Sequence, residues 1–149
     1  MSKAFEDALT AGVEKRLAER RSEAAESDQK SRQLAADRQR SNELLQNVVR
    51  PVVRATQERL KSLSPEVRFV DSDIHGSMDG IVLQVQIAAG SSVDLQFETA
   101  PDGTMVFRAG TVSDHRKFLG LADADGRIAR TEEDAEDCLL SALRAMRII

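Results

Sequence analysis

The longest uninterrupted pattern in the chain is a helix-forming stretch that runs from Val13 to Val49. These 37 residues contain neither glycine nor proline and are rich in Ala, Glu, Arg, Gln, Lys and Leu, all of which have high helix propensity. The pattern predicts one helix, roughly 55 Å long at a rise of 1.5 Å per residue. Such a rod is longer than the width of the small domain that the other residues could form, so we expect part of it to project or to bind a partner.

Apolar residues at every fourth position mark the start of the chain. Steps of four residues drift slowly around a helix, so these side chains lie along one stripe. Gly12 weakens this helix by about 1 kcal/mol relative to alanine without ending it. The stripe has no evident site to cover in the domain, and we therefore predict that it binds a partner through Phe5, Leu9, Val13 and Leu17.

Between Ala18 and Asn42 the helix is polar. A heptad register that joins Leu17 to Leu45 fills only some of its seam positions with apolar residues, whereas a stable coiled coil needs nearly all of them. Two interpretations stay open: a solvated helix, which is favoured, or a loose dimeric or antiparallel coil that closes over small residues. Those small residues are Ala24, Ala25, Ala35 and Ala36.

A wide apolar stripe from Leu44 to Leu63 indicates a helix that lies on a sheet. Pro51 lies inside it and lacks the backbone N–H that a helix interior requires, which predicts a kink or a junction between two helices near residues 48–50. The Ser64-Pro65 pair ends this helix, because the residue before a proline is pushed away from helical angles.

The apolar period then changes from helical to two. Alternation around Phe69, Leu83, Leu95 and Phe107 predicts four strands, each with one apolar and one polar face. Gly90-Ser91-Ser92 and Pro101-Asp102-Gly103 are short enough to be hairpin turns, so we expect an antiparallel meander.

The last third of the chain predicts smaller elements and one helix. Residues 113–126 form a long connection that could hold a helical turn, and Arg127 to Arg130 could add a short edge strand. Thr131, followed by three acidic residues, is typical of a helix N-cap, and the helix should continue to about Arg147. We expect it to pack beside the 44–63 helix on the same face of the sheet.

The predicted fold is therefore α+β: a long N-terminal helix kinked near Pro51, a meander of four to five antiparallel strands with the helices on one face, and a C-terminal helix. We divide it into a helical arm, residues 1–43, and a globular domain, residues 44–149. Charge supports two parts of different character, because residues 1–63 carry a net charge of +3 and residues 64–149 carry −7.

The composition limits the cellular compartment that we expect for the protein and the kinds of disulfide and metal site that it can form. Cys138 is the single cysteine, which excludes an internal disulfide and a multi-thiolate metal site. No signal peptide or membrane span is evident, so we expect a cytoplasmic protein that binds no membrane, with leaderless secretion left open.

Four features of the sequence raise the question of chemistry. The acidic loop of residues 71–80 and the Asp123 to Asp125 segment match no metal-ligand spacing, so we predict turns there and no metal or other cofactor. His75 and His115 lack identifiable partners for acid–base catalysis, and Cys138 is predicted to be a core thiol.

The predicted function is that of a non-enzymatic protein–protein interaction module: an adaptor, a chaperone-like protein or an assembly subunit. Its helical arm would capture a protein partner or form a homodimer. The alternative is a nucleic-acid-associated protein that uses basic residues of the arm, although acidic residues interrupt each basic cluster and no aromatic platform accompanies them. The candidate contacts for this alternative are Arg16, Arg20, Arg21, Arg38 and Arg40.

Overall fold

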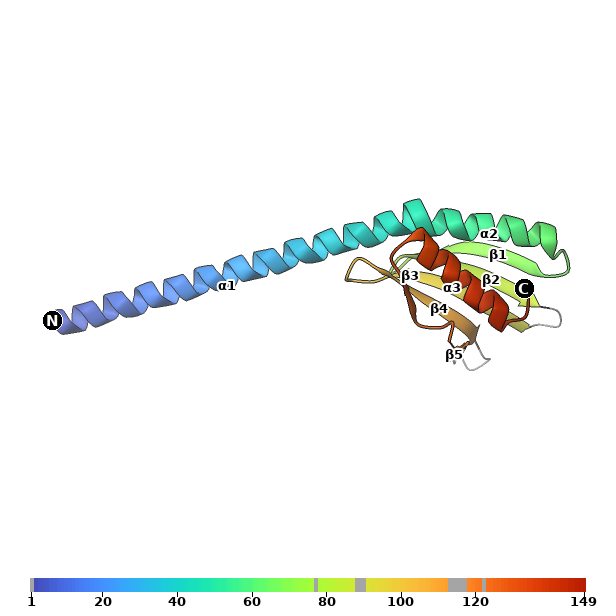
Figure 1. The fold of residues 1–149 in the computed structure, drawn as a ribbon. Helices are drawn as coiled ribbons and strands as arrows, with labels where there is room; N and C mark the ends of the chain where they lie inside the picture. The colour runs from blue at the N-terminus through green and yellow to red at the C-terminus, as the bar shows by residue number, and fades with distance from the viewer. Residues whose placement is uncertain (1, 77, 88–90, 113–117, 122) are drawn as a thin grey trace. The chain divides into compact units, whose positions relative to one another are not determined.

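The computed structural model describes residues 2–76, 78–87, 91–112, 118–121 and 123–149, and it confirms the predicted α+β class. Two successive helices and a π-helical turn precede an antiparallel sheet, and one helix follows it (Figure 1). In chain order the elements are α1 (Lys3–Leu44), η1 (Leu45–Val49), α2 (Arg50–Leu63), β1 (Arg68–Ile74), β2 (Gly80–Ile87), β3 (Ser91–Thr99), β4 (Met105–Val112), β5 (Phe118–Gly120), β6 (Arg127–Ala129) and α3 (Glu132–Ala145).

The chain divides into two compact units after Ala36. Within the first unit, every residue from 2 to 36 is exposed and all but the first of them belong to α1. The second unit runs from Asp37 to Ile149 and contains the last residues of α1 with all the other elements. The predicted arm of residues 1–43 thus overlaps the second unit by seven residues, 37–43.

The overlap has a physical cause at Ser41, the one buried residue of α1. Its hydroxyl donates a hydrogen bond of 2.7 Å to the carbonyl oxygen of Ala100, and the carbonyl oxygen of Thr104 lies 3.3 Å away. These contacts join the end of α1 to the turn between β3 and β4. The globular unit therefore begins before Leu44, where the apolar stripe of the 44–63 helix starts.

The irregularity predicted near Pro51 is a π-helical turn, η1, in which the Arg50 N–H donates to the carbonyl oxygen of Leu45. Buried residues recur here at steps of four, which drift by about 40° per step around an ordinary α-helix. A π turn takes more residues per turn and offsets part of that drift, so the buried side chains keep facing the sheet. They are Ser41, Leu45, Val49, Val53 and Gln57.

The strands form the predicted antiparallel meander in the order β1-β2-β3-β4-β5, and β6 pairs with β4. One turn was wrongly placed: Ser91 and Ser92 belong to β3, because the pairing of β2 with β3 continues to Ser92 opposite Gln86 and Ser91 opposite Ile87. Gly90 lies outside the described residues. The second predicted turn is present, with Gly103 at a φ of 88°.

Two short strands cover the outer edge of β4. β5 pairs with its end and β6 with its beginning, and the turn between them is held by the Asp125 N–H, which donates to the carbonyl oxygen of Leu121 at 3.0 Å. The Asp125 carboxylate accepts from the Ala109 N–H at 3.1 Å and from the Arg108 guanidinium at 2.9 Å. The predicted edge strand is confirmed, whereas β5 was not expected.

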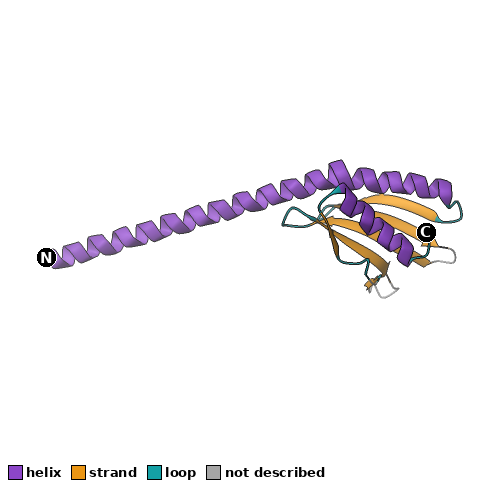
Figure 2. Ribbon diagram, viewed as in Figure 1, coloured by secondary structure: helices purple, strands orange, loops and turns teal. Residues whose placement is uncertain are grey.

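Within the globular unit, α2 and α3 cover one face of the sheet, as predicted (Figure 2). Alternate residues of the four long strands face inward, and the ring centres of Phe97 and Phe107 lie 4.7 Å apart on adjacent strands. The core that results is contributed by the sheet, η1, α2 and α3. Its largest fully buried apolar side chains include Phe69, Phe97, Phe107, Leu45, Ile81, Leu83, Leu95 and Met105.

The final helix is two residues shorter than predicted. Arg147 adopts a φ of 57°, and the Ile148 N–H turns back to donate to the carbonyl oxygen of Leu143 at 3.0 Å. This left-handed residue ends the helix as a glycine often does. It also directs the chain so that Ile149 lines a groove beside α3.

Candidate interaction surfaces

The four residues predicted to bind a partner lie along α1 and are all exposed. Phe5, Leu9, Val13 and Leu17 expose 52%, 51%, 58% and 44% of their surface. Three of them, Leu9, Val13 and Leu17, line a shallow hollow of about 410 Å³ on one side of the helix together with neighbouring residues. We call this surface the tip stripe; besides those four residues it contains Ala8, Gly12, Arg16 and Arg20.

Gly12 lies in the middle of the tip stripe, and a Cβ atom added to it would meet nothing within 4 Å. No side chain or turn in this part of α1 therefore requires a glycine here. A glycine in an exposed helix nevertheless costs about 1 kcal/mol relative to alanine. Its absent side chain leaves open space in which another molecule's backbone could approach the helix closely.

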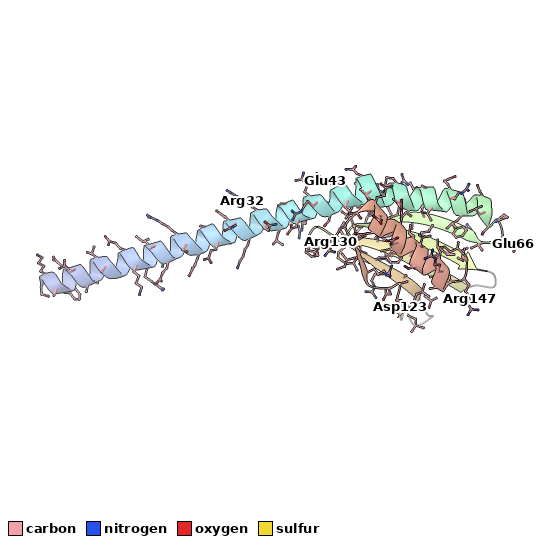
Figure 3. The ribbon with its side chains drawn as sticks, viewed as in Figure 1. Arg32, Glu43, Glu66, Asp123, Arg130 and Arg147 are labelled. Carbon is pink, nitrogen blue, oxygen red and sulfur yellow. The ribbon has the colours of Figure 1, made fainter. Side chains whose placement is uncertain are left out.

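The five arginines considered for nucleic-acid binding are all exposed on α1. Arg16 forms a long ion pair of 3.5 Å with Glu19, and Arg40 pairs with Asp37, which lies one turn earlier. Arg38 and Arg40 belong to the second compact unit, whereas Arg16, Arg20 and Arg21 belong to the first. The side chains of α1 extend from all around the helix, with Arg32 labelled among them (Figure 3), so acidic and basic groups are mixed.

A second surface lies within the globular unit and was not predicted from the sequence. It is an apolar groove of about 720 Å³ between the η1–α2 segment and α3. We call it the helix groove. Its lining comprises Asn47, Val48, Pro51, Val52, Ala55, Thr56, Arg59, Leu60, Glu132, Glu136, Leu139, Leu140, Leu143 and Ile149.

The sequence does contain a signal for the helix groove. Val48 and Val52 lie one residue away from the buried Val49 and Val53, so the apolar stripe of this segment is wider than one packing surface needs. Leu140 likewise follows the buried Leu139 and stays exposed. An apolar residue beside each buried one indicates a second surface on the same helix.

Charged residues mark the two ends of the helix groove. α3 follows β6, and Ala129 of β6 pairs with Met105 at the start of β4. The turn just before β4 is bonded to Ser41, which precedes η1. Glu132 and Glu136, in the first turns of α3, therefore lie at the η1 end of the groove, as Figure 1 shows for the start of α3, and Arg59 lies toward the end of α2.

Two of the three acidic residues in the 71–80 segment, Asp71 and Asp73, lie in β1 and not in the predicted turn, and they are placed beside arginines of α2. The Asp73 carboxylate lies 2.9 Å from the Arg50 guanidinium, and Asp71 lies 3.8 Å from Arg54. These ion pairs join β1 to the helix above it. Within the described residues, no three His, Cys, Asp or Glu side chains gather in a way that could hold a metal ion.

Of the residues considered for catalysis, the structure describes His75 and Cys138, which lie in different surroundings. His75 is exposed in the loop after β1, and His115 lies outside the described residues. Cys138 is buried on the inner side of α3, where loss of hydration raises the pKa of its thiol to about 11. A thiol with so high a pKa stays protonated near neutral pH and is a poor nucleophile.

The outer face of the sheet is polar and half-buried. On it, Asp94 faces Gln84 across the β2–β3 pair, and Gln84 donates a side-chain hydrogen bond to it. Burial nevertheless raises the pKa of the Asp94 carboxyl. Among the residues whose side chains the structure describes, this face offers hydrogen bonds and no large aromatic side chain.

Comparison with protein families, curated proteins and solved structures finds no match to this chain. None of the helices in the described ranges has both the length and the apolar character that crossing a membrane requires. The function therefore has to be argued from the two surfaces.

Proposed function

We propose that this chain is a non-enzymatic protein–protein interaction module, whose α1 helix serves for self-association or for capture of a protein partner. An adaptor, a chaperone-like protein or an assembly subunit would have this property. The observation that carries the proposal is the tip stripe, four large apolar side chains in register along a helix and each about half exposed.

The stripe differs from ordinary exposed apolar residues in being contiguous. Single exposed leucines such as Leu34 are common on protein surfaces and need no explanation. The four apolar side chains of the tip stripe lie along one side of about three helical turns and form a patch, and such patches are typical of binding sites. Burying the exposed half of each side chain would stabilise a complex by about 1 kcal/mol per residue.

The polar groups of the chain support a binding role over catalysis. Asp73 and Asp71, which precede His75 in the chain, form ion pairs with Arg50 and Arg54, and the cysteine lies in the core. The helix groove has apolar walls, and its charged residues are separated toward its two ends. Neither surface brings together an acid, a base and a nucleophile.

The test compares the unmodified chain with a Leu9→Glu/Val13→Glu variant by analytical ultracentrifugation. Both substitutions keep residues of adequate helix propensity and place charges on the tip stripe. We expect the unmodified chain to associate and the variant to be monomeric with unchanged helical circular dichroism. The matched control is Leu34→Glu, which adds a charge at an isolated exposed leucine of the same helix and should leave association unchanged.

Capture of a different protein is tested with the same variants as bait in a lysate. If the unmodified chain is monomeric and the stripe variant recovers the same proteins as the unmodified chain, the proposal is wrong. Retention of a DNA or RNA oligonucleotide that weakens steeply with salt would then favour the alternative, nucleic-acid binding through the arginines of α1.

A further inference from the structure

The helix groove needs an occupant, and the chain itself supplies a helix of matching shape and charge. We infer that the tip stripe of a second copy of this chain docks into the helix groove, antiparallel to α2, and that two copies exchange this contact reciprocally. The inference rests on the proposed function, since it names the partner of the same tip stripe.

The apolar residues of the tip stripe have the same spacing as residues that line the helix groove. Phe5, Leu9, Val13 and Leu17 advance in steps of four, and so do four groove-lining residues of the η1–α2 segment: Val48, Val52, Thr56 and Leu60. Each set extends about 18 Å along its helix. Two rows of equal step and equal length can face each other along their whole length where the two helix axes lie nearly aligned. An antiparallel helix would bring Leu17 to Val48 and Phe5 to Leu60.

The charged residues at the two ends of the helix groove are complementary to those along the start of α1. The tip stripe carries Arg16 and Arg20 at its far end, and Glu6 lies in the first turn of the same helix. The helix groove carries Glu132 and Glu136 at the η1 end and Arg59 toward the end of α2. In the antiparallel orientation the two arginines face the two glutamates.

At the opposite end of the groove, the same orientation brings Glu6 to Arg59. A parallel orientation would instead place Glu6 beside Glu132 and Glu136, and the stripe's arginines beside Arg59. Like charges would then meet at both ends of the groove. Electrostatics therefore selects the antiparallel orientation.

The continuity of α1 favours a second copy as the source of the docked helix. Residues 13–49 contain neither glycine nor proline, and α1 is helical from Lys3 to Leu44. A second copy can supply the same helix intact, and the open space at Gly12 permits close approach of the groove wall.

The test is a thiol cross-link between two variants of the full chain, both in a Cys138→Ala background so that each has one thiol. One variant is Ala8→Cys on the tip stripe and the other is Ala55→Cys in the helix groove; both positions are exposed. The two are mixed, allowed to exchange subunits and treated with a short thiol cross-linker.

We expect a cross-linked dimer in the mixture and none in either variant alone. The matched control pairs Ala8→Cys with Asn47→Cys, which lies at the η1 end of the groove and should link roughly tenfold more slowly, because thiol linkage requires closely placed Cα atoms. A parallel helix would place Ala8 opposite Pro51, four residues from both Asn47 and Ala55, so linkage to Asn47 as fast as to Ala55 would overturn the antiparallel orientation.

The other outcomes separate this inference from the proposed function. If Ala8→Cys alone forms a linked dimer, two tip stripes pack on each other, so the helix still binds but the groove does not receive it. If an Ala8→Cys/Ala55→Cys double variant gives only an internally linked monomer, the stripe occupies its own groove. If the chain is dimeric by mass and no pair links, the groove is not the docking site. A chain that is monomeric and whose stripe variant recovers unchanged partners contradicts both proposals.

Discussion

Cys138 is the residue whose chemistry the fold alters most clearly. Its thiol is buried beside Leu139 in the core, and burial raises its pKa from 9.0 to about 11, against the opposing effect of the Arg127 charge. The folded chain keeps the thiol protonated up to about pH 11, whereas the unfolded chain releases the proton near pH 9. The stabilisation is therefore fully present below pH 9 and is lost as the pH rises toward 11.

This difference predicts that the free energy of unfolding falls by about 1.4 kcal/mol per pH unit over that range through Cys138 alone. Urea denaturation at pH 8, 9, 10 and 11 would measure it. The Cys138→Ala variant is the control, since it lacks the thiol and should show a smaller decline. Equal declines in the two proteins would contradict the account of Cys138.

Residue-scale features divide into those with local causes and those with distant ones. The burial of Cys138 follows from its position on the apolar side of α3 and was predicted. The burial of Ser41 was not, because its acceptor, the carbonyl of Ala100, lies 59 residues away in the chain. A serine within a polar stretch carries no sign of such a partner. The sequence also could not show that Asp71 and Asp73 meet arginines of α2.

At the scale of the element, the N-terminus of α3 is the best-defined helix end. The Thr131 hydroxyl accepts a hydrogen bond from the Asp134 N–H at 3.2 Å, and the Asp134 carboxylate accepts one from the Arg130 N–H at 2.9 Å. Two N–H groups near the helix start are thereby satisfied, and three acidic residues lie in the first turn.

Replacing Thr131 with alanine removes one of these acceptors and should lower the free energy of unfolding by about 1 kcal/mol. Chemical denaturation monitored by circular dichroism measures this loss. Thr131→Ser keeps the hydroxyl and is the matched control, with stability close to that of the unmodified chain. A Thr131→Ala variant as stable as Thr131→Ser would show that the cap contributes nothing.

Elements with strong local patterns were predicted well. The four long strands, the α3 N-cap and the end of α2 before Pro65 each follow from period or from a single residue type. β5 was not predicted, because three residues are too short to show a period. The form of η1 also escaped prediction: Pro51 indicates an irregularity, but a π turn depends on how Leu45 and Val49 face the sheet.

At the scale of the whole molecule, the proposed interface consists of two surfaces, the tip stripe and the helix groove. The tip stripe is visible in the sequence because four apolar residues recur on a polar helix. The helix groove shows in the sequence only as an unusually wide apolar stripe, because locating it requires knowing that α3 lies next to the η1–α2 segment with Leu140 and Ile149 lining the space between them. The sequence therefore predicted one half of the proposed interface and not the other.

Self-association is the central claim of this account, and the mass of the unmodified chain in solution tests it most directly. Sedimentation equilibrium should be measured over roughly 1 to 200 µM, a range that detects dissociation constants in the micromolar range. We predict that the average mass rises with concentration toward twice the 16.4 kDa of one chain. A single species of 16.4 kDa at every concentration would contradict the claim.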